Sequence, residues 1–352
     1  MTDNPRFIPG LDLSRRFYNE VLRDSIGTPH AAGRVGSGSD ALGYDTPTST
    51  DHDWGPRCHV FVEAADVDAV RRRIEAALPE EFLGWPVRFA LDEEVPVQHH
   101  VEVQTIGRWL RGELAIDPRD GLSTRTWLLL PQQQLLHVTA GEVFHDDTGE
   151  LAAVRARLAW YPDEVWRYLL GCAWRRIGQE EAFVGRTSEV GDEIGSRIVV
   201  ARLARDLVRL CFLLERRYAP YSKWLGTAFA RLDAAAELQP PLERMLSADT
   251  YEHRELGLVA AYETIGRRFN ALGVVPLVEP TVRPFYSRPF LVLMADRFAD
   301  ACFATLEDPW LRSLPPVGSV DQYLDSTDAL YAERAMRTMA LLAPDQPPTP
   351  NP

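Results

Sequence analysis

The first hundred residues alternate between helical and strand-like spacing of apolar positions. Leu13, Phe17, Val21 and Leu22 fall on one helical face, which predicts an amphipathic helix from about Leu11 to Ile26. Further elements are predicted as a helix over Asp66–Leu78 and short strands at Arg57–Val62, Pro86–Leu91 and Val101–Thr105. The alternation predicts a small mixed sheet with helices, an α+β domain.

Beyond about residue 150 the apolar spacing is helical throughout. Helices are predicted around Trp166–Ala173 and Ile198–Leu214 and over Tyr251–Leu272, Phe290–Leu306 and Ala329–Leu342, with proline-rich joints at Pro240–Pro241 and Pro315–Pro316. We therefore expect an α+β domain over residues 1–150, followed by an all-α helical-bundle domain over residues 151–342. Residues 343–352 contain five prolines and no apolar period, so we expect a disordered tail.

Composition excludes some partners and favours one compartment. The formal net charge of −13 disfavours non-specific nucleic-acid binding, which depends on basic surface. No apolar run approaches 18 residues and no signal peptide is recognisable, so we expect no membrane contact. The four cysteines lie far apart without metal-ligand spacing. Buried thiols of this kind indicate a cytoplasmic protein.

The stretch from Val35 to Trp54 contains the strongest chemical signal. Gly36 and Ser37 begin a small-residue turn, Gly-Ser-Gly-Ser-Asp, whose backbone amides and hydroxyls can bind phosphate oxygens. About a dozen residues later come Asp51 and Asp53. On a strand these two side chains would share a face while His52 points away, so the two carboxylates could hold Mg²⁺. The order of these parts indicates a metal–nucleotide site.

Two other phosphate-binding motifs fit this stretch poorly. A Walker A loop requires a Gly-Lys-Ser/Thr sequence, and no lysine lies near the turn. Gly36-x-Gly38-x-x-Ala41 matches a relaxed dinucleotide fingerprint, but that motif follows a strand and opens a helix. Thr28–Arg34 makes a poor strand, and Gly43 and Pro47 interrupt any helix. The dinucleotide interpretation is therefore disfavoured.

A third carboxylate is expected on a neighbouring strand. Glu102 lies between Val101 and Val103, and an acid inside an apolar strand is costly unless it is paired or binds a metal. Alternatively, Glu102 faces solvent on a half-exposed strand. Glu63 and Asp92 are weaker alternatives, because each lies at a strand end where solvated acids are common.

Only one of the 38 cationic side chains is a lysine, and it is Lys223. It lies in Tyr-Ala-Pro-Tyr-Ser-Lys-Trp, at a predicted break between two helices. Lysine provides a compact ammonium where arginine provides a planar fork, so Lys223 is a candidate phosphate contact. The alternative is a surface lysine that remained by chance.

These motifs together resemble the polymerase-beta-like nucleotidyltransferase superfamily. The Gly-Ser-Gly-Ser-Asp turn, Asp51-His52-Asp53-Trp54-Gly55, the Pro-Tyr-x-Lys-Trp segment, Arg288-Pro289-Phe290 and Ala295-Asp296-Arg297-Phe298 look like a bacterial family of unknown function. In that family a nucleotidyltransferase domain precedes a helical one, a layout similar to aminoglycoside and lincosamide nucleotidyltransferases. The resemblance covers nearly the whole chain.

The resemblance implies a site residue by residue. Gly36, Ser37, Ser39 and Asp40 would bind the nucleotide, and Asp51 and Asp53 would hold Mg²⁺, with two ions expected. Glu102 would be the third catalytic and metal-binding acid by position alone. Lys223 would be a nucleotide contact from the helical domain.

The expected reaction is Mg²⁺-dependent transfer of an NMP from an NTP, with ATP favoured, to a hydroxyl of a small molecule, with release of pyrophosphate. Candidates for the general base are Glu102 and, from the helical domain, Glu180, Glu189 and Asp192. Two alternatives stay open: a protein or RNA acceptor, and a non-catalytic nucleotide-binding protein of the same fold. The acceptor and the oligomeric state are not indicated.

Overall fold

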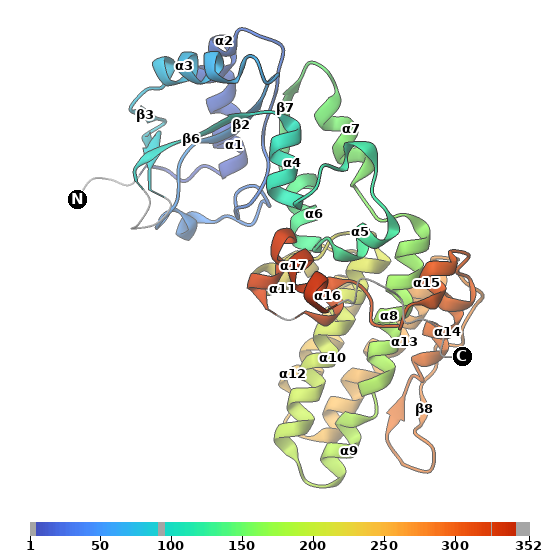
Figure 1. The fold of residues 1–352 in the computed structure, drawn as a ribbon. Coiled ribbons are helices and arrows are strands. Elements are labelled where there is room, and N and C mark those ends of the chain that lie inside the picture. Colours follow the sequence, from blue (N-terminus) through green and yellow to red (C-terminus); the bar gives the residue numbers. More distant parts are fainter. Residues whose placement is uncertain (1–4, 91–95, 325, 343–352) are drawn as a thin grey trace. The chain divides into compact units, whose positions relative to one another are not determined.

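The computed structural model describes residues 5–90, 96–324 and 326–342 (Figure 1). These residues form two compact units. The sheet unit comprises Met1–Leu122, Gln133–Ala159 and Tyr331–Glu333, and the helical unit comprises Ser123–Gln132, Trp160–Leu330 and Arg334–Pro352. The functional domains expected over residues 1–150 and 151–342 remain predictions. The expected tail, Leu91 and Asp92 lie outside the described residues.

The sheet unit contains the predicted alternation of helices and strands. Its helical elements are α1 (Gly10–Phe17), a π-helical turn (Tyr18–Leu22), α2 (Arg23–Ile26), a 3₁₀ turn (Pro47–Thr50), α3 (Val67–Ala77), α4 (Ile106–Leu114), a 3₁₀ turn (Pro118–Asp120), α6 (Gln132–Thr139) and α7 (Glu150–Arg157). Its strands are β1 (Ala31–Arg34), β2 (Arg57–Phe61), β3 (Glu81–Phe82), β4 (Trp85–Pro86), β5 (Arg88–Phe89), β6 (Gln98–Gln104) and β7 (Glu142–Asp146). The first predicted helix is therefore confirmed as one continuous helical run with a π-turn in its middle.

A five-stranded mixed sheet organises this unit, in the order β5-β6-β2-β1-β7. β1 is antiparallel to β2 and β7, whereas β2 and β6 are parallel, with His59 opposite Glu102. A separate two-stranded ribbon pairs β3 with β4. The prediction that Thr28–Arg34 makes a poor strand is wrong, because Ala31–Arg34 forms β1. This strand pairs with β2 on one side and β7 on the other, which a short sequence window cannot reveal.

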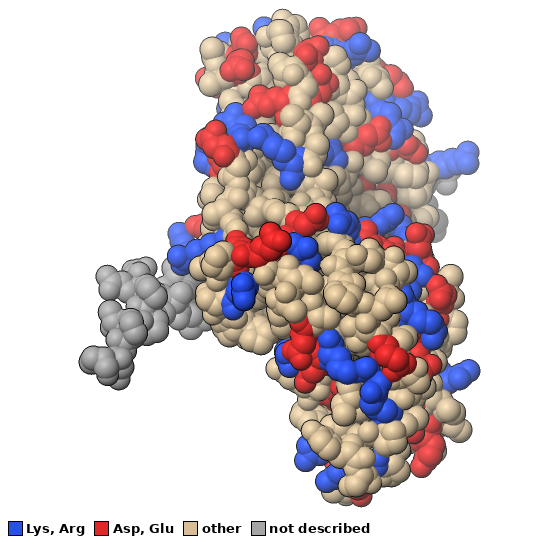
Figure 2. Space-filling model, turned by 90° about the vertical axis from the view of Figure 1, so that its right-hand side faces the viewer, with Lys and Arg blue, Asp and Glu red and all other residues tan. Residues whose placement is uncertain are grey.

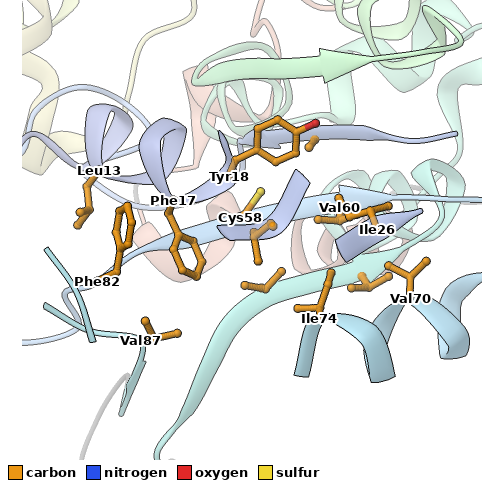
Figure 3. Close-up of a cluster of buried hydrophobic side chains, with 14 of the residues drawn as sticks. Leu13, Phe17, Tyr18, Ile26, Cys58, Val60, Val70, Ile74, Phe82 and Val87 are labelled. Carbon is orange, nitrogen blue, oxygen red and sulfur yellow. The ribbon is translucent and has the colours of Figure 1, made fainter. Parts of the chain in front are cut away.

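A hydrophobic core cluster of the sheet unit lies on one face of this sheet. Side chains from the first helical run and α3 pack against alternate residues of the strands, including Cys58, Val60, Val101 and Val103 (Figure 3). Each fully buried apolar side chain of this kind contributes roughly 1.5–3 kcal/mol to folding. These alternate residues of β2 and β6 thus point into this cluster, whereas Phe61 is buried against Trp109 of α4 on the other face.

The helical unit is built from long helices, as the spacing predicts. Its elements are α5 (Thr124–Leu129), α8 (Asp163–Glu180), α9 (Phe183–Glu189), α10 (Glu193–Leu214), α11 (Ser222–Phe229), α12 (Ala235–Ser247), α13 (Tyr251–Ala271), β8 (Arg283–Pro284), β9 (Leu291–Val292), α14 (Asp296–Ala304), α15 (Pro309–Ser313), α16 (Val320–Tyr323) and a 3₁₀ turn (Thr327–Leu330). The final helix, α17 (Ala332–Leu342), begins at residues assigned to the sheet unit. Trp174 of α8 stacks on Phe298 of α14 with ring centroids 4.5 Å apart. Among the described residues, no helix combines the length and the apolarity needed to cross a membrane.

Two boundaries in the helical unit differ from the prediction. Pro240–Pro241 is not a joint but lies inside α12, where burial of Leu238, Leu242 and Met245 offsets the two lost backbone donors. The helix predicted from Phe290 begins only at Asp296, because β9 and a following turn occupy the preceding residues.

Glu181 holds that turn. Its carboxylate accepts hydrogen bonds from the amides of Leu293, Met294 and Ala295 at 2.8–3.1 Å, immediately before α14. Burial raises the pKa of Glu181 to about 7, although these three hydrogen bonds oppose the shift. Hydrogen bonds to Glu181, which directly follows α8, therefore fix residues 293–295 in a turn, and α14 begins only after it.

Candidate functional site

The glycine turn directly follows β1. Gly36 and Gly38 have φ angles of +86° and +120°, a left-handed conformation that side chains other than glycine rarely adopt. The Gly36 amide donates to the carbonyl of His137 at 2.9 Å, which fixes the start of the turn against α6. The two glycines are therefore required by the backbone path.

Arg34, the last residue of β1, holds the inside of this turn. Its guanidinium donates to the carbonyls of Val35 and Ser37 at 2.5 and 2.6 Å and to both carboxylate oxygens of Asp40 at 2.6–2.8 Å. Burial opposes the charge of Asp40, but the adjacent Arg34 outweighs it and lowers the pKa of that carboxyl. Asp40, expected at the nucleotide, thus shapes the turn through a buried ion pair.

The amides at the centre of the turn are available to a ligand. Within the described part of the chain, the backbone N–H groups of Ser37, Gly38 and Ser39 have no hydrogen-bond acceptor. The Ser37 side chain is exposed, and Gly38 and Ser39 are half-buried. Successive free amides beside glycines with positive φ form the kind of concavity that binds anions.

Asp51 and Asp53 lie in a bend and not on a strand, so the expected strand geometry is wrong. Asp53 has a φ of +52°, and its carboxylate forms an ion pair with Arg57 at the start of β2. Asp51 is exposed, and His52, instead of pointing away, lies 2.7 Å from it through Nδ1. The strand begins only at Arg57, because Gly55-Pro56 interrupts an extended ladder.

Glu102 lies on β6, on the face opposite the apolar core. Its Oε2 is 3.5 Å from Nε2 of His59, its partner across the parallel strands. Loss of hydration, followed by the negative charge of Glu113, raises the pKa of Glu102. Burial lowers the pKa of His59 to about 3, so the ring is neutral and this contact is not an ion pair.

Three residues beside this face were not predicted as site residues. Glu113 of α4 lies 3.1 Å from Nδ1 of His137, and Gln133 lies 2.8 Å from the other ring nitrogen of that histidine. A Cβ added to Gly36 would lie 3.5 Å from both Glu113 and His59. Glu113 therefore borders the glycine turn. In the sequence it is one acid in an amphipathic helix, with no local signal of its position.

Arg34 links the separate acids electrostatically. Burial disfavours its charge, but Asp40, then Glu102 and Asp53, raise its pKa. The negative charges of Asp53, in the bend before β2, and of Glu102, on β6, thus both favour the charged form of the Arg34 guanidinium. Within the described residues, no contact brings Asp51 to Glu102.

The remaining site candidates belong to the helical unit. Lys223 is exposed at the start of α11, with its ammonium 5.1 Å from the ring centroid of Trp224. Glu180 forms an ion pair with Arg202, Glu189 with Arg288, and Asp192 caps α10 by accepting from the Gly195 amide. Each of these three acids has a structural partner.

A cavity of about 100 Å³ opens elsewhere in the sheet unit. Its lining includes Phe61, Glu63, Thr105 and Arg119. None of Gly36, Ser37, Asp51, Asp53 or Glu102 lines it. This cavity therefore does not coincide with the predicted site.

Comparison with known proteins identifies one family match. A domain of unknown function, DUF4037, matches residues 127–225, from α5 into α11, and this range includes Lys223. No curated protein matches the chain. Among solved structures, the chain is similar to a nucleotidyltransferase-like protein from Exiguobacterium sibiricum 255-15, at 13% identity over 74% of this chain and 76% of that chain, with a TM-score of 0.34. A TM-score this low transfers neither fold nor reaction, so over residues 127–225 the chain matches a family whose own function is unknown.

Proposed function

We propose that this protein is a Mg²⁺-dependent nucleotidyltransferase that moves an NMP from an NTP, with ATP favoured, to a hydroxyl of a small molecule. One observation carries the proposal: the glycine turn, with free amides, lies beside acids of the sheet unit. A Cβ on Gly36 would lie 3.5 Å from both Glu113 and His59, and His59 lies 3.5 Å from Glu102. Free amides that can bind phosphate and carboxylates that can bind a cation thus lie close together, which supports nucleotidyl transfer.

The donor chemistry suits Mg²⁺. Asp53 and Glu102, with Asp51, supply only carboxylate oxygens, the ligands this ion takes together with substrate phosphates. Asp53 would exchange its Arg57 partner for the cation, and the bend at 51–53 leaves both aspartates at least partly exposed for this exchange. Bound Mg²⁺ would supply charge neutralisation at the phosphates.

The glycine turn would orient the triphosphate. The amides of Ser37, Gly38 and Ser39 are the donors, with the exposed Ser37 hydroxyl beside them. Arg34 keeps the neighbouring carbonyls of Val35 and Ser37 turned inward, so that the turn presents donors to its ligand. Preorganised donors of this kind stabilise developing charge without reorganisation.

The reaction forms a bond between the acceptor oxygen and the α-phosphorus and breaks the bond from that phosphorus to the bridging oxygen. Pyrophosphate leaves with the electron pair of the broken bond. The acceptor hydroxyl proton passes to a carboxylate, for which Glu102 and Glu113 are the candidates beside the turn. The helical-unit acids are less suited to this role because they already have structural partners.

Lys223 stays a proposed phosphate contact. Its support is its uniqueness among 38 cationic residues and its place within the matched family range.

Figure 2 shows that Lys and Arg are interspersed with Asp and Glu on the face drawn, which lacks the continuous basic surface favoured by an RNA acceptor. Four buried free thiols fit a reducing cytoplasm.

The test measures pyrophosphate release from each NTP with Mg²⁺ and candidate hydroxyl acceptors. Asp53→Asn and Glu102→Gln are expected to lower turnover at least about 100-fold, the scale for losing a preorganised charge-stabilising group. Asp68→Asn is the control, because Asp68 is an exposed acid of α3 with no proposed role in the site. Equal turnover of the wild type, Asp53→Asn and Glu102→Gln would contradict the proposal.

A further inference from the structure

A second group of ligand-type side chains lies where β1 begins and β7 ends. His30 immediately precedes β1, His145 lies in β7, and Asp147 immediately follows it. Of the residues that the structure describes, these form the one group of three His, Cys, Asp or Glu side chains whose donor atoms all lie within 4.8 Å of one another. None of the three belongs to the site proposed for the nucleotide.

The backbone places these side chains together. The Asp147 amide donates to the His30 carbonyl at 3.1 Å, and the His30 amide donates to Oδ2 of Asp147 at 2.8 Å, which extends the β1–β7 ladder by one pair. Residues two apart on a strand share a face, so His145 lies beside Asp147. The cluster is therefore a product of strand register.

The side-chain distances are near those of a metal site. Nε2 of His145 lies 2.8 Å from Oδ1 of Asp147, and Nδ1 of His30 lies 3.8 Å from Oδ2. The two imidazole centroids are 4.6 Å apart. A Zn²⁺ with ligand bonds of about 2.0–2.2 Å requires only small movements from this arrangement.

We propose that His30, His145 and Asp147 form a binding site for a transition-metal cation, with Zn²⁺ preferred. Two imidazoles and one carboxylate suit Zn²⁺, whereas Mg²⁺ and Ca²⁺ select oxygen ligands. Three protein ligands leave a fourth position for water. The site is chemically distinct from the all-carboxylate set around Arg34.

His30 already has the outer support that a metal-bound histidine needs. Its Nδ1 lies 2.9 Å from the Thr28 carbonyl, and its Nε2 lies 2.9 Å from the Tyr18 hydroxyl. A hydroxyl can donate or accept, so Tyr18 pairs with Nε2 in either tautomer. When the cation takes Nδ1 in place of the Thr28 hydrogen bond, Nε2–H donates to Tyr18, the usual partner arrangement of ligating histidines.

The His30–His145–Asp147 cluster has a buried side and a solvent-exposed side. The Tyr18 ring lies at the edge of the apolar cluster, with its hydroxyl oxygen directed away from the labelled aliphatic side chains (Figure 3). The His30 side chain is only 8% exposed, whereas those of His145 and Asp147 are 28% and 39% exposed. A cation can therefore enter from the solvent side and meet a fixed histidine.

The experiment titrates the metal-free full chain with Zn²⁺ by calorimetry and with Co²⁺ by visible absorption. The wild type is expected to bind one equivalent with histidine coordination, and Zn²⁺ is expected to raise its melting temperature. His145→Ala and Asp147→Asn are each expected to weaken binding at least about 10-fold, the lower end of the losses seen even for outer partners. His253→Ala, which removes an exposed histidine of α13, should bind as the wild type does.

Circular dichroism checks that each variant is folded. Asp147→Asn keeps an oxygen that can accept from the His30 amide. This variant is therefore expected to stay folded even if His145→Ala does not. Absence of binding to the wild type, or equal affinity of the wild type and a folded Asp147→Asn variant, would overturn the proposal. The latter result would place bound Zn²⁺ elsewhere, for example at Asp51–His52. Neither readout uses nucleotide turnover, so this proposal and the proposed function fail independently.

Discussion

The two faces of strands β2 and β6 differ in polarity. On one face, Cys58, Val60, Val101 and Val103 are at most 5% exposed and pack into the core. On the other, Phe61 is buried against Trp109, while His59 and Glu102 lie side by side and Glu102 remains largely exposed. The same two strands therefore contribute to a core and to a candidate site.

This difference predicts which property a substitution on each face will change. A core face is held by many equivalent apolar contacts, whose sum stabilises the fold. The polar face depends on a few charges whose partners come from distant segments, such as Arg34 with Asp53 and Glu102. Substitutions on the first face should change stability, and those on the second should change chemistry.

The largest expected effect lies at Arg34, where the two roles meet. Arg34→Met would leave the buried Asp40 carboxylate without its partner, and we expect the free energy of unfolding to fall by roughly 3–5 kcal/mol. Urea unfolding measures this loss. Arg57→Met, which removes the partner of the partly exposed Asp53, is the matched control and should cost far less. An equal effect of the two substitutions would contradict the importance of burial.

A pair of neighbouring substitutions on β6 tests the two faces directly. Val103→Ala should lower the free energy of unfolding by about 1–3 kcal/mol and leave turnover of the folded protein unchanged, because it removes buried apolar area. Glu102→Gln should leave the unfolding midpoint nearly unchanged while turnover falls. The predicted division between a stabilising face and a functional face is contradicted if Val103→Ala reduces turnover of the folded protein as much as Glu102→Gln does.

A smaller, pH-dependent effect is expected at Asp321, a buried acid of the helical unit. Burial raises its pKa to about 6, although Arg209 opposes the shift. The folded state therefore holds this proton more tightly than the unfolded chain, whose ordinary value is 3.8. The resulting stability is present below pH 3.8 and is lost as the pH rises through about 6.

Asp321→Asn removes this dependence and keeps an oxygen for the Gln132 amide, which now donates to the carboxylate at 2.9 Å. Relative to wild type, the variant should gain on the order of 2 kcal/mol between pH 4 and pH 7. Urea midpoints across this range measure the gain. Asp328→Asn, at an exposed acid, should show no such trend; a flat difference for Asp321→Asn would refute the assignment.

Local patterns predicted the elements whose spacing was regular. The first helical run, α3, α8, α10 and α13 follow from apolar spacing, and β2 and β6 from short apolar runs. The proline pair of α12 and the late start of α14 did not follow, because burial and the distant carboxylate of Glu181 outweighed local preference there. Local rules fail where a tertiary partner contributes more free energy than the propensity does.

The sequence alone determined which residues could do chemistry. The glycine pair, Asp51, Asp53 and an acid in an apolar strand are visible in one dimension, because backbone conformation and the cost of burying charge act locally. The sequence could not show that Asp53 lies in a bend, or that Asp40 forms an ion pair with Arg34.

Tertiary structure alone decided which of these residues meet. Parallel pairing of β2 with β6 placed Glu102 beside His59, and the β1–β7 ladder brought His30 to Asp147 across more than a hundred residues of chain. Such pairs depend on strand register, which is set by the packing of a whole sheet face and not by any short segment.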